Sequence, residues 1–141
     1  MALPEHHIEE IEHTADWAIR VRARDVPGVF VGAARGMFGL LTDLSQVVGE
    51  RRFEISLRAI DVETLLVDWL NELLFLGEQE GLVFCDFDIH DLAANGEARL
   101  RAQASGGRPG ELLKVIKAAT FSGLAIERGA DGFQVDLVFD V

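Results

Sequence analysis

The sequence predicts an α+β fold in which a mixed, largely antiparallel sheet of about six strands packs on two main helices and one short helix. Three observations support this prediction. Several segments alternate apolar and polar side chains with a period of two, which is typical of half-buried strands. Two longer segments repeat apolar residues with a period near 3.6, which is typical of amphipathic helices. Strands and helices do not follow one another in a regular βαβ order, which argues against a doubly wound parallel sheet.

The first strand is predicted over residues 17–24, where apolar and charged side chains alternate. A stretch with a proline and a glycine ends that pattern, and a helical period over residues 29–42 predicts the first helix. This helix carries three glycines on one side, Gly32, Gly36 and Gly39. Each costs the helix roughly 1 kcal/mol relative to alanine. We therefore expect another element of the fold, or alternatively a partner, to approach this helix closely.

Alternation returns over residues 52–59 and predicts a second strand. Asp61 has the residue type of a helix N-cap, and the second helix is predicted from there to about Gly77. Its apolar arc is wide, so we expect this helix at the centre of the core. Phe75 is an exception, because it is an aromatic residue on the polar side of the helix and suggests contact with a partner.

The C-terminal half is predicted to contain four strands and the short helix. A loop rich in glycine, with one proline, separates the first two of these strands from the helix, and turn residues join the last two in a hairpin. The strands are expected at about residues 83–90, 98–104, 120–127 and 133–140, and the short helix over residues 111–117.

Length and charge limit the functions to consider. The chain has 141 residues and is predicted to form a single domain over residues 1–141. Its formal net charge of −11 argues against salt-sensitive nucleic-acid binding over a broad surface, because such binding needs a basic footprint. Direct contact with RNA is therefore not expected to dominate its function.

The sequence predicts a cytoplasmic protein that does not enter membranes. Cys85 is the only cysteine, which excludes an intramolecular disulfide and a cysteine-rich zinc site and fits a reducing compartment. The longest run without a charged residue has nine residues, whereas a membrane-spanning helix needs about 20. The first residues contain no basic segment followed by an apolar one, so no secretory signal is expected.

Several carboxylates stand at structurally awkward positions. Asp16 precedes the first strand, three residues after His13, and Asp43 ends the first helix, where the helix dipole disfavours an anion. Asp140 follows a strongly apolar strand and is next to Val141. Clusters of oxygen ligands suit a hard cation such as Ca²⁺, Mg²⁺ or Mn²⁺. Each acid also has a structural explanation as a helix cap, a solvated strand end or an arginine partner, and spacing alone favours that explanation.

Other charged groups can likewise be interpreted either as a functional site or as an ordinary structural feature. Two predicted strands carry charged side chains on one face, the first with three arginines and the third with two aspartates and a histidine. These residues are Arg20, Arg22, Arg24, Asp86, Asp88 and His90. For the arginines, a solvated face is favoured over contact with RNA or with an acidic partner. For the second group, a solvated face that is ion-paired with arginines on adjacent strands is favoured over a metal site. Asp68 and Glu72 are like charges one turn apart on the second helix, which is mildly destabilising.

Five segments, in the same order and over essentially the whole chain, resemble the archease family. HTAD and LLVDWLNELLF are the specific motifs, and the others support them. The segments are HTAD at 13–16, AARGMFGLLTD at 33–43, VETLLVDWLNELLF at 62–75, LKVIKAATF at 113–121 and VFDV at 138–141. One departure is Ser122, where many members have a histidine, so no role of that histidine is carried over.

The resemblance implies an archease-like fold and an accessory protein that is not itself an enzyme. Archeases assist the GTP-dependent RNA ligase RtcB, which joins RNA ends in tRNA splicing and RNA repair. They promote transfer of guanylate to the histidine of the ligase and support multiple turnover. Family members bind a divalent metal at an acidic site. The resemblance assigns Asp16, Asp140 and Val141 to that site, with His13 and Asp43 as nearby support, and Ca²⁺ as first choice ahead of Mg²⁺ or Mn²⁺.

We further expect the first and last predicted strands to be neighbours, so that Asp16 and Asp140 converge on one cation. That cation would order this end of the domain for docking, or offset phosphate charge at the nucleotide site of the ligase. Two alternatives remain open. One is a metal-dependent phosphoesterase-like enzyme that uses the same acids, although the sequence offers no convincing nucleophile. The other is a general chaperone or protein-binding module, suggested by the acidity and by Phe75.

Overall fold

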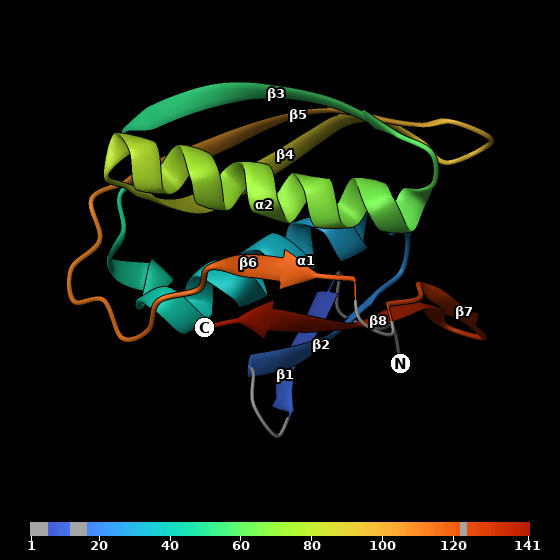
Figure 1. The fold of residues 1–141 in the computed structure, drawn as a ribbon, viewed down its shortest axis with the longest axis horizontal. Helices are drawn as coiled ribbons and strands as arrows, with labels where there is room; N and C mark the ends of the chain where they lie inside the picture. The colour runs from blue at the N-terminus through green and yellow to red at the C-terminus, as the bar shows by residue number, and fades with distance from the viewer. Residues whose placement is uncertain (1–5, 12–16, 122–123) are drawn as a thin grey trace.

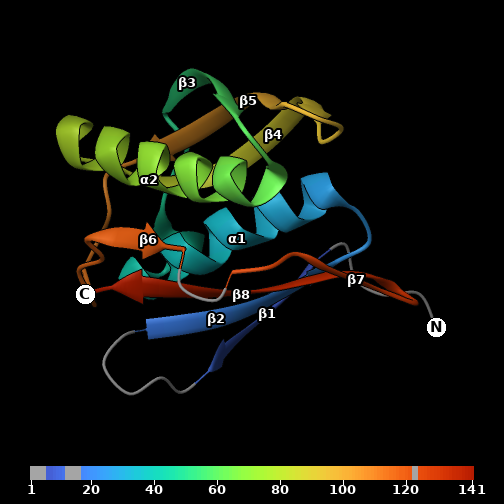
Figure 2. The ribbon, with the colours of Figure 1, turned by 45° about the vertical axis from the view of Figure 1, so that its right-hand side comes forward.

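Two antiparallel sheets enclose a pair of helices in the computed structural model of the chain, which describes residues 6–11, 17–121 and 124–141. Figures 1 and 2 show α1 (Val26–Leu41) and α2 (Val62–Glu80) as a layer between the sheets. Each helix contacts strands of both sheets, so one core is shared by all three layers. No helix in the described part of the chain has the length and apolar character needed to span a membrane.

The larger sheet is built around β8 (Gly132–Asp140), near the C-terminal end of the sequence. Its strand order is β1-β2-β8-β6, and β7 also pairs with β8 through a tight turn. The register of β2 on β8 places Trp17 opposite Phe139 and Ala23 opposite Phe133. The remaining strands of this sheet are β1 (His6–Ile11), β2 (Trp17–Ala23), β6 (Ala118–Thr120) and β7 (Glu127–Gly129).

The smaller sheet has the order β3-β5-β4, with β5 (Ala98–Gly107) in the centre. Its flanking strands are β3 (Arg51–Ala59) and β4 (Val83–Ala93). Buried apolar side chains alternate with exposed polar ones along β3 and β5, so one face packs on the helices and the other meets solvent. The register of β4 shifts twice, between Phe84 and Asp86 and between Ile89 and Asp91, as at β-bulges.

Both helices begin at an aspartate that caps free backbone amides. The carboxylate of Asp25 accepts a hydrogen bond from the Gly28 amide at 2.7 Å, and that of Asp61 accepts one from the Thr64 amide at 2.8 Å. The hydrogen bond to Thr64 lowers the pKa of Asp61. The helix α2 ends at Gly81, whose φ of 68° is a left-handed conformation that favours glycine. The N-cap predicted at Asp61 is confirmed, and the helix continues three residues beyond Gly77 to Glu80.

A close approach explains two of the three α1 glycines that the sequence singled out, Gly32 and Gly36. A Cβ atom on Gly36 would lie 2.6 Å from Cδ1 of Ile19, and one on Gly32 would lie 2.8 Å from Cγ1 of Val21. Both contacts come from β2, so an element of the fold packs tightly on this face of the helix. A Cβ on Gly39 would meet nothing within 4 Å.

The predicted α+β class and its antiparallel character are confirmed, and the structure corrects several details. The described strands form two sheets, and β1 was not predicted because its sequence, HHIEEI, lacks a clear alternation. The strand expected over residues 120–127 is not formed in the described part of that range, since β6 ends at Thr120 and β7 starts at Glu127.

The short helix expected over residues 111–117 is also absent. A helix of this length is only marginally stable, and here the backbone bonds elsewhere. The Leu113 amide donates to the Leu41 carbonyl at 2.6 Å, and the Lys117 amide donates to the Asp140 carbonyl at 2.8 Å.

Candidate functional site

The end of β8 at Asp140 is the described part of the predicted acidic site. The expectation that the first and last predicted strands are neighbours is confirmed, because β2 pairs over its whole length with residues 133–139 of β8. Trp17 lies opposite Phe139, the residue before Asp140. His13 and Asp16 lie outside the described residues, so their convergence with Asp140 stays a prediction.

The backbone fixes Asp140 while its carboxylate stays free. Asp140 pairs with Ala118 of β6, and its carbonyl accepts the amide of Lys117. Its side chain is exposed and has no hydrogen-bond or ion-pair partner among the residues that the structure describes. Val141 is 43% exposed beside it. This end of the strand therefore presents oxygen atoms to solvent from a backbone that is paired with β6.

Asn71 of α2 holds β6 against the helix layer. Its side-chain amide donates to the Ala119 carbonyl at 3.2 Å, and its side-chain carbonyl accepts the Ala119 amide at 2.8 Å. Together these bonds complete the hydrogen bonding of a buried residue in the edge strand. Sequence reasoning missed this role, although Asn71 lies within the LLVDWLNELLF motif.

A lysine fastens the segment before β6 to the start of β2. The ammonium group of Lys114 lies 3.3 Å from the ring centroid of Trp17 and 3.9 Å from a carboxylate oxygen of Glu10. A cation over an indole face is attracted by the ring quadrupole. This contact also went unpredicted, because nothing in the local pattern links residues so far apart in the sequence.

Asp43 has a local structural role. The helix α1 ends at Leu41 with Thr42 as its C-cap, and Asp43 caps the 3₁₀ turn η1 (Leu44–Gln46). Its carboxylate accepts hydrogen bonds from the amide of Ser45 at 3.0 Å and from its hydroxyl at 2.7 Å. The Asp43 carboxylate thus has hydrogen-bond donors within its own turn, whereas the Asp140 carboxylate has none among the described residues.

The other acidic candidates do not form a cluster. No group of three histidine, cysteine or acidic residues suited to a metal is found within residues 6–11, 17–121 and 124–141. The side chain of Asp68 is exposed on α2, and partial desolvation by its neighbours raises its pKa. Asp86 forms an ion pair with Arg35 at 3.5 Å, and Asp88 lies 3.9 Å from His90.

The arginines of β2 are paired within the larger sheet. Arg20 forms a two-pronged contact with Asp136, with hydrogen bonds of 2.8 and 3.1 Å, and lies 3.6 Å from Glu9. Arg22 contacts Glu9 at 3.2 Å and donates to Gln134 at 2.9 Å. These arginines were expected to form a solvated face, whereas the structure shows Arg20 and Arg22 half-buried and paired with neighbouring strands of the same sheet.

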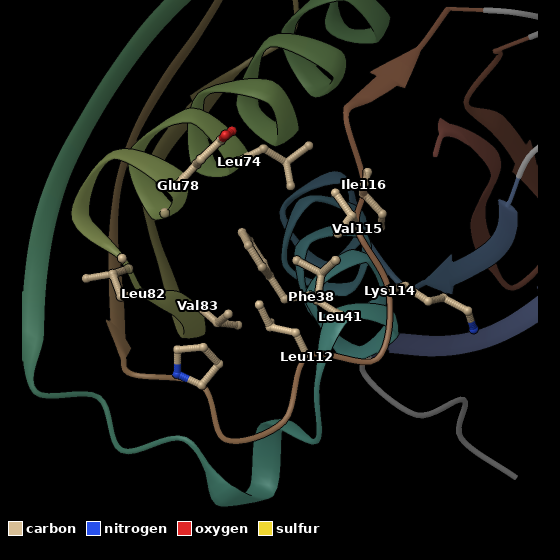
Figure 3. A pocket seen from close by; sticks show the side chains of 13 residues that line it. Phe38, Leu41, Leu74, Glu78, Leu82, Val83, Leu112, Lys114, Val115 and Ile116 are labelled. Atoms are coloured by element: carbon tan, nitrogen blue, oxygen red, sulfur yellow. The ribbon is translucent and has the colours of Figure 1, made fainter.

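An apolar pocket opens near the end of β8 that carries Asp140. Its volume is about 330 Å³, and it lies between the C-terminal turns of α1 and α2, the start of β4 and the segment over residues 109–116. Figure 3 shows Phe38, Leu82 and Leu112 around it, while the ammonium group of Lys114 points away. In the same segment, Leu113 is 61% exposed, and Val115, which lines the pocket, is 70% exposed.

Comparison with known proteins places the chain in a family. The model of the Archease protein family (MTH1598/TM1083) matches residues 8–141. The chain belongs to the archease family. The protein archease of Methanosarcina acetivorans is 38% identical over 140 residues, covering 94% of each chain. That of Methanopyrus kandleri is 36% identical over 138 residues, covering 94% of this chain and 98% of its own.

Two solved structures are similar to this archease fold. Protein 1598 of Methanobacterium thermoautotrophicum superposes with a TM-score of 0.82 at 28% identity, covering 95% of this chain and 98% of its own. An archease of Thermotoga maritima, named a possible chaperone, superposes with a TM-score of 0.61 at 21% identity and supports the fold alone. It covers 94% of this chain and 96% of its own. The resemblance drawn from the sequence motifs is confirmed.

Proposed function

We propose that this archease activates a GTP-dependent RNA ligase of the RtcB type by promoting its guanylylation and multiple turnover. The observation that carries the proposal is membership of the archease family over nearly the whole chain. The proposal places the active end of the protein where β2 begins and β8 ends. The β2–β8 register supports this placement, because Asp16 is bonded to Trp17 and Trp17 lies opposite the neighbour of Asp140.

The donor groups at this end suit a hard divalent cation. The Asp140 carboxylate is exposed and unpartnered among the described residues, and oxygen is the donor type that Ca²⁺, Mg²⁺ and Mn²⁺ prefer. Asp140, Asp16 and Val141 would hold the ion, with His13 and Asp43 nearby. When bound, the ion would supply positive charge that offsets the phosphate charge of the nucleotide.

The residues around this end keep it in place. Asn71 and β6 hold the Asp140 backbone, and Lys114 holds Trp17 at the start of β2. A rigid backbone lowers the entropy that docking must overcome, so these contacts would favour binding to a partner enzyme.

The test is single-turnover guanylylation of the cognate ligase with GTP, with and without this protein, in divalent cation and in chelator. We expect a metal-dependent acceleration that Asp16→Asn and Asp140→Asn each abolish. Asp131→Asn is the matched control, because it removes one exposed carboxylate from the opposite end of β8. Thermal unfolding of each variant checks that the fold is retained.

Two results would contradict the proposal. No acceleration of a ligase shown to be active would exclude the accessory role. Full stimulation by Asp140→Asn or Asp16→Asn would exclude the proposed metal site while leaving the accessory role in place.

A general protein-binding role is the second candidate, and the exposed apolar side chains favour it. Phe75 is 59% exposed on α2, and Leu113 and Val115 are exposed beside the apolar pocket. Such groups are typical of surfaces that contact other proteins. Metal-independent suppression of aggregation of unrelated proteins would support this candidate. Turnover of phosphoesters by the protein alone would instead support the phosphoesterase alternative.

A further inference from the structure

We propose that the outer face of β3 and β5 binds the phosphodiester backbone of single-stranded RNA. We call this surface the β3–β5 strip, and Figures 1 and 2 place it on the side of the smaller sheet that faces away from the helices. The strip consists of the outward side chains of the two strands, which are Arg52, Glu54, Ser56, Arg58, Arg99, Arg101, Gln103 and Ser105.

The register concentrates positive charge at one end of the strip. Arg58 lies directly opposite Arg99, and Arg101 lies opposite Ser56 in the next row. Like charges that face each other across two strands destabilise a sheet. The three arginines border a hollow of about 360 Å³ together with Ser56 and Asp91. A bound anion would relieve this repulsion.

The arginines of the strip lack the partners found on the larger sheet. Arg52, Arg99 and Arg101 form no hydrogen bond or ion pair within the described residues, in contrast to Arg20 and Arg22. Arg58 lies 3.5 Å from Glu97, and both side chains are mostly exposed, so this pair is weak. The strip therefore offers guanidinium groups that are free to bind phosphate oxygens.

The carboxylates on this sheet restrict where an anion can lie. The strip contains four arginines and one glutamate, and Glu54 already accepts a hydrogen bond from Gln103. Three carboxylates of the edge strand β4 lie opposite residues of the strip, namely Asp86 opposite Ser105, Asp88 opposite Gln103 and Asp91 opposite Arg101. A polyanion would be repelled by β4 and held over β3 and β5, so the contact is narrow. This agrees with the expectation that an acidic chain does not bind RNA over a broad surface.

Charge complementarity and shape favour a nucleic-acid strand. Arginines lie at both ends of the strip, separated by six residues along β3, or about 20 Å at the usual rise per residue. A ligand that reaches both ends must repeat its negative charge along an extended chain, as a phosphodiester backbone does. The aromatic residues of β3 and β4, Phe53, Phe84 and Phe87, pack toward the core. With no aromatic group outside to stack on bases, the contact is confined to the phosphodiester backbone, so binding is expected to be independent of base sequence.

Fluorescence anisotropy of a labelled oligouridylate with the protein alone tests this proposal. We expect binding that weakens as salt is raised. The double substitution Arg99→Gln/Arg101→Gln should lower the affinity about tenfold and make the slope of log K against log salt shallower by about 1.4, the value for two lost single-strand phosphate contacts. The matched control is Arg108→Gln/Arg128→Gln, which removes two exposed arginine charges outside the strip and should change neither quantity.

Other results would overturn the inference. One is the absence of oligouridylate binding at low salt, and another is an equal loss of oligouridylate affinity in the two double variants. A third is polyglutamate binding as tight as oligouridylate binding, which would indicate an acidic protein partner. The experiment contains no ligase, so its outcome is separate from that of the guanylylation test. If Arg99→Gln/Arg101→Gln loses oligouridylate binding but still activates the ligase, the β3–β5 strip and the proposed metal site act independently.

Discussion

The side chain of Asn71 faces the backbone of Ala119 and both donates to it and accepts from it. The two groups it bonds belong to an edge strand of only three residues, which could not hold its position by pairing with β8 alone. Because Ala118 and Lys117 bond to Asp140, the asparagine acts on the end of β8 through the backbone. A single residue in the central helix thus connects the core to the proposed metal site.

Replacing this asparagine tests that connection. In Asn71→Leu the buried amide of Ala119 loses its partner, which should lower the free energy of unfolding by about 1–3 kcal/mol. Hydrogen exchange should show faster exchange at Ala119 and Lys117 than in the parent. Gln79→Leu is the control, because it also replaces a side-chain amide by leucine, but at an exposed position of α2. Unchanged exchange at Ala119 in Asn71→Leu would contradict the assigned role.

At the scale of the elements, the glycines of α1 provide a matched comparison. Gly36→Ala places a methyl group against Ile19 and Ile8, and overpacking of this kind costs about 1–3 kcal/mol. Gly39→Ala meets nothing within 4 Å and should gain up to about 1 kcal/mol from helix propensity. Urea unfolding should therefore move the two midpoints in opposite directions. If both substitutions stabilise the protein, β2 does not pack on Gly36 as closely as the structure indicates.

The elements also show how far the sequence alone could lead. Periodicity predicted both long helices and the strands β2 and β3, because one face of each is buried. The strands β4, β5 and β8 were also predicted close to their observed bounds. The helix predicted over residues 111–117 was wrong, because the apolar residues of this segment line a pocket or lie exposed and do not form one buried helix face. For the site, the β2–β8 pairing was anticipated from the metal site that the family resemblance implies. The contacts of Asn71 and Lys114 could not be anticipated, because they join residues 48 and 97 positions apart whose proximity depends on the complete fold.

For the whole molecule, the two sheets use their outer faces differently. On the larger sheet, Arg20 and Arg22 form ion pairs with Glu9 and Asp136, and Arg22 also donates a hydrogen bond to Gln134. On the smaller sheet, arginines of the β3–β5 strip lie beside an acidic edge strand without pairing to it. A chain with a net charge of −11 therefore carries a local basic surface far from its proposed metal-binding end.

The shared helix layer predicts that the two sheets unfold together. Each helix buries apolar side chains against both sheets. If either sheet unfolded, these side chains would be exposed to water, and the other sheet and the helices would lose the stabilisation that their burial provides. The two tryptophans report on different layers, because Trp17 lies at the end of the larger sheet and the Trp69 ring lies 6.1 Å from that of Phe87 in the smaller one. In the variants Trp17→Phe and Trp69→Phe, urea unfolding followed by the remaining tryptophan should coincide with unfolding followed by far-UV circular dichroism. A fluorescence transition of Trp17 at lower urea than the circular dichroism transition would show that the larger sheet opens first, and that the helices are held mainly by the smaller one.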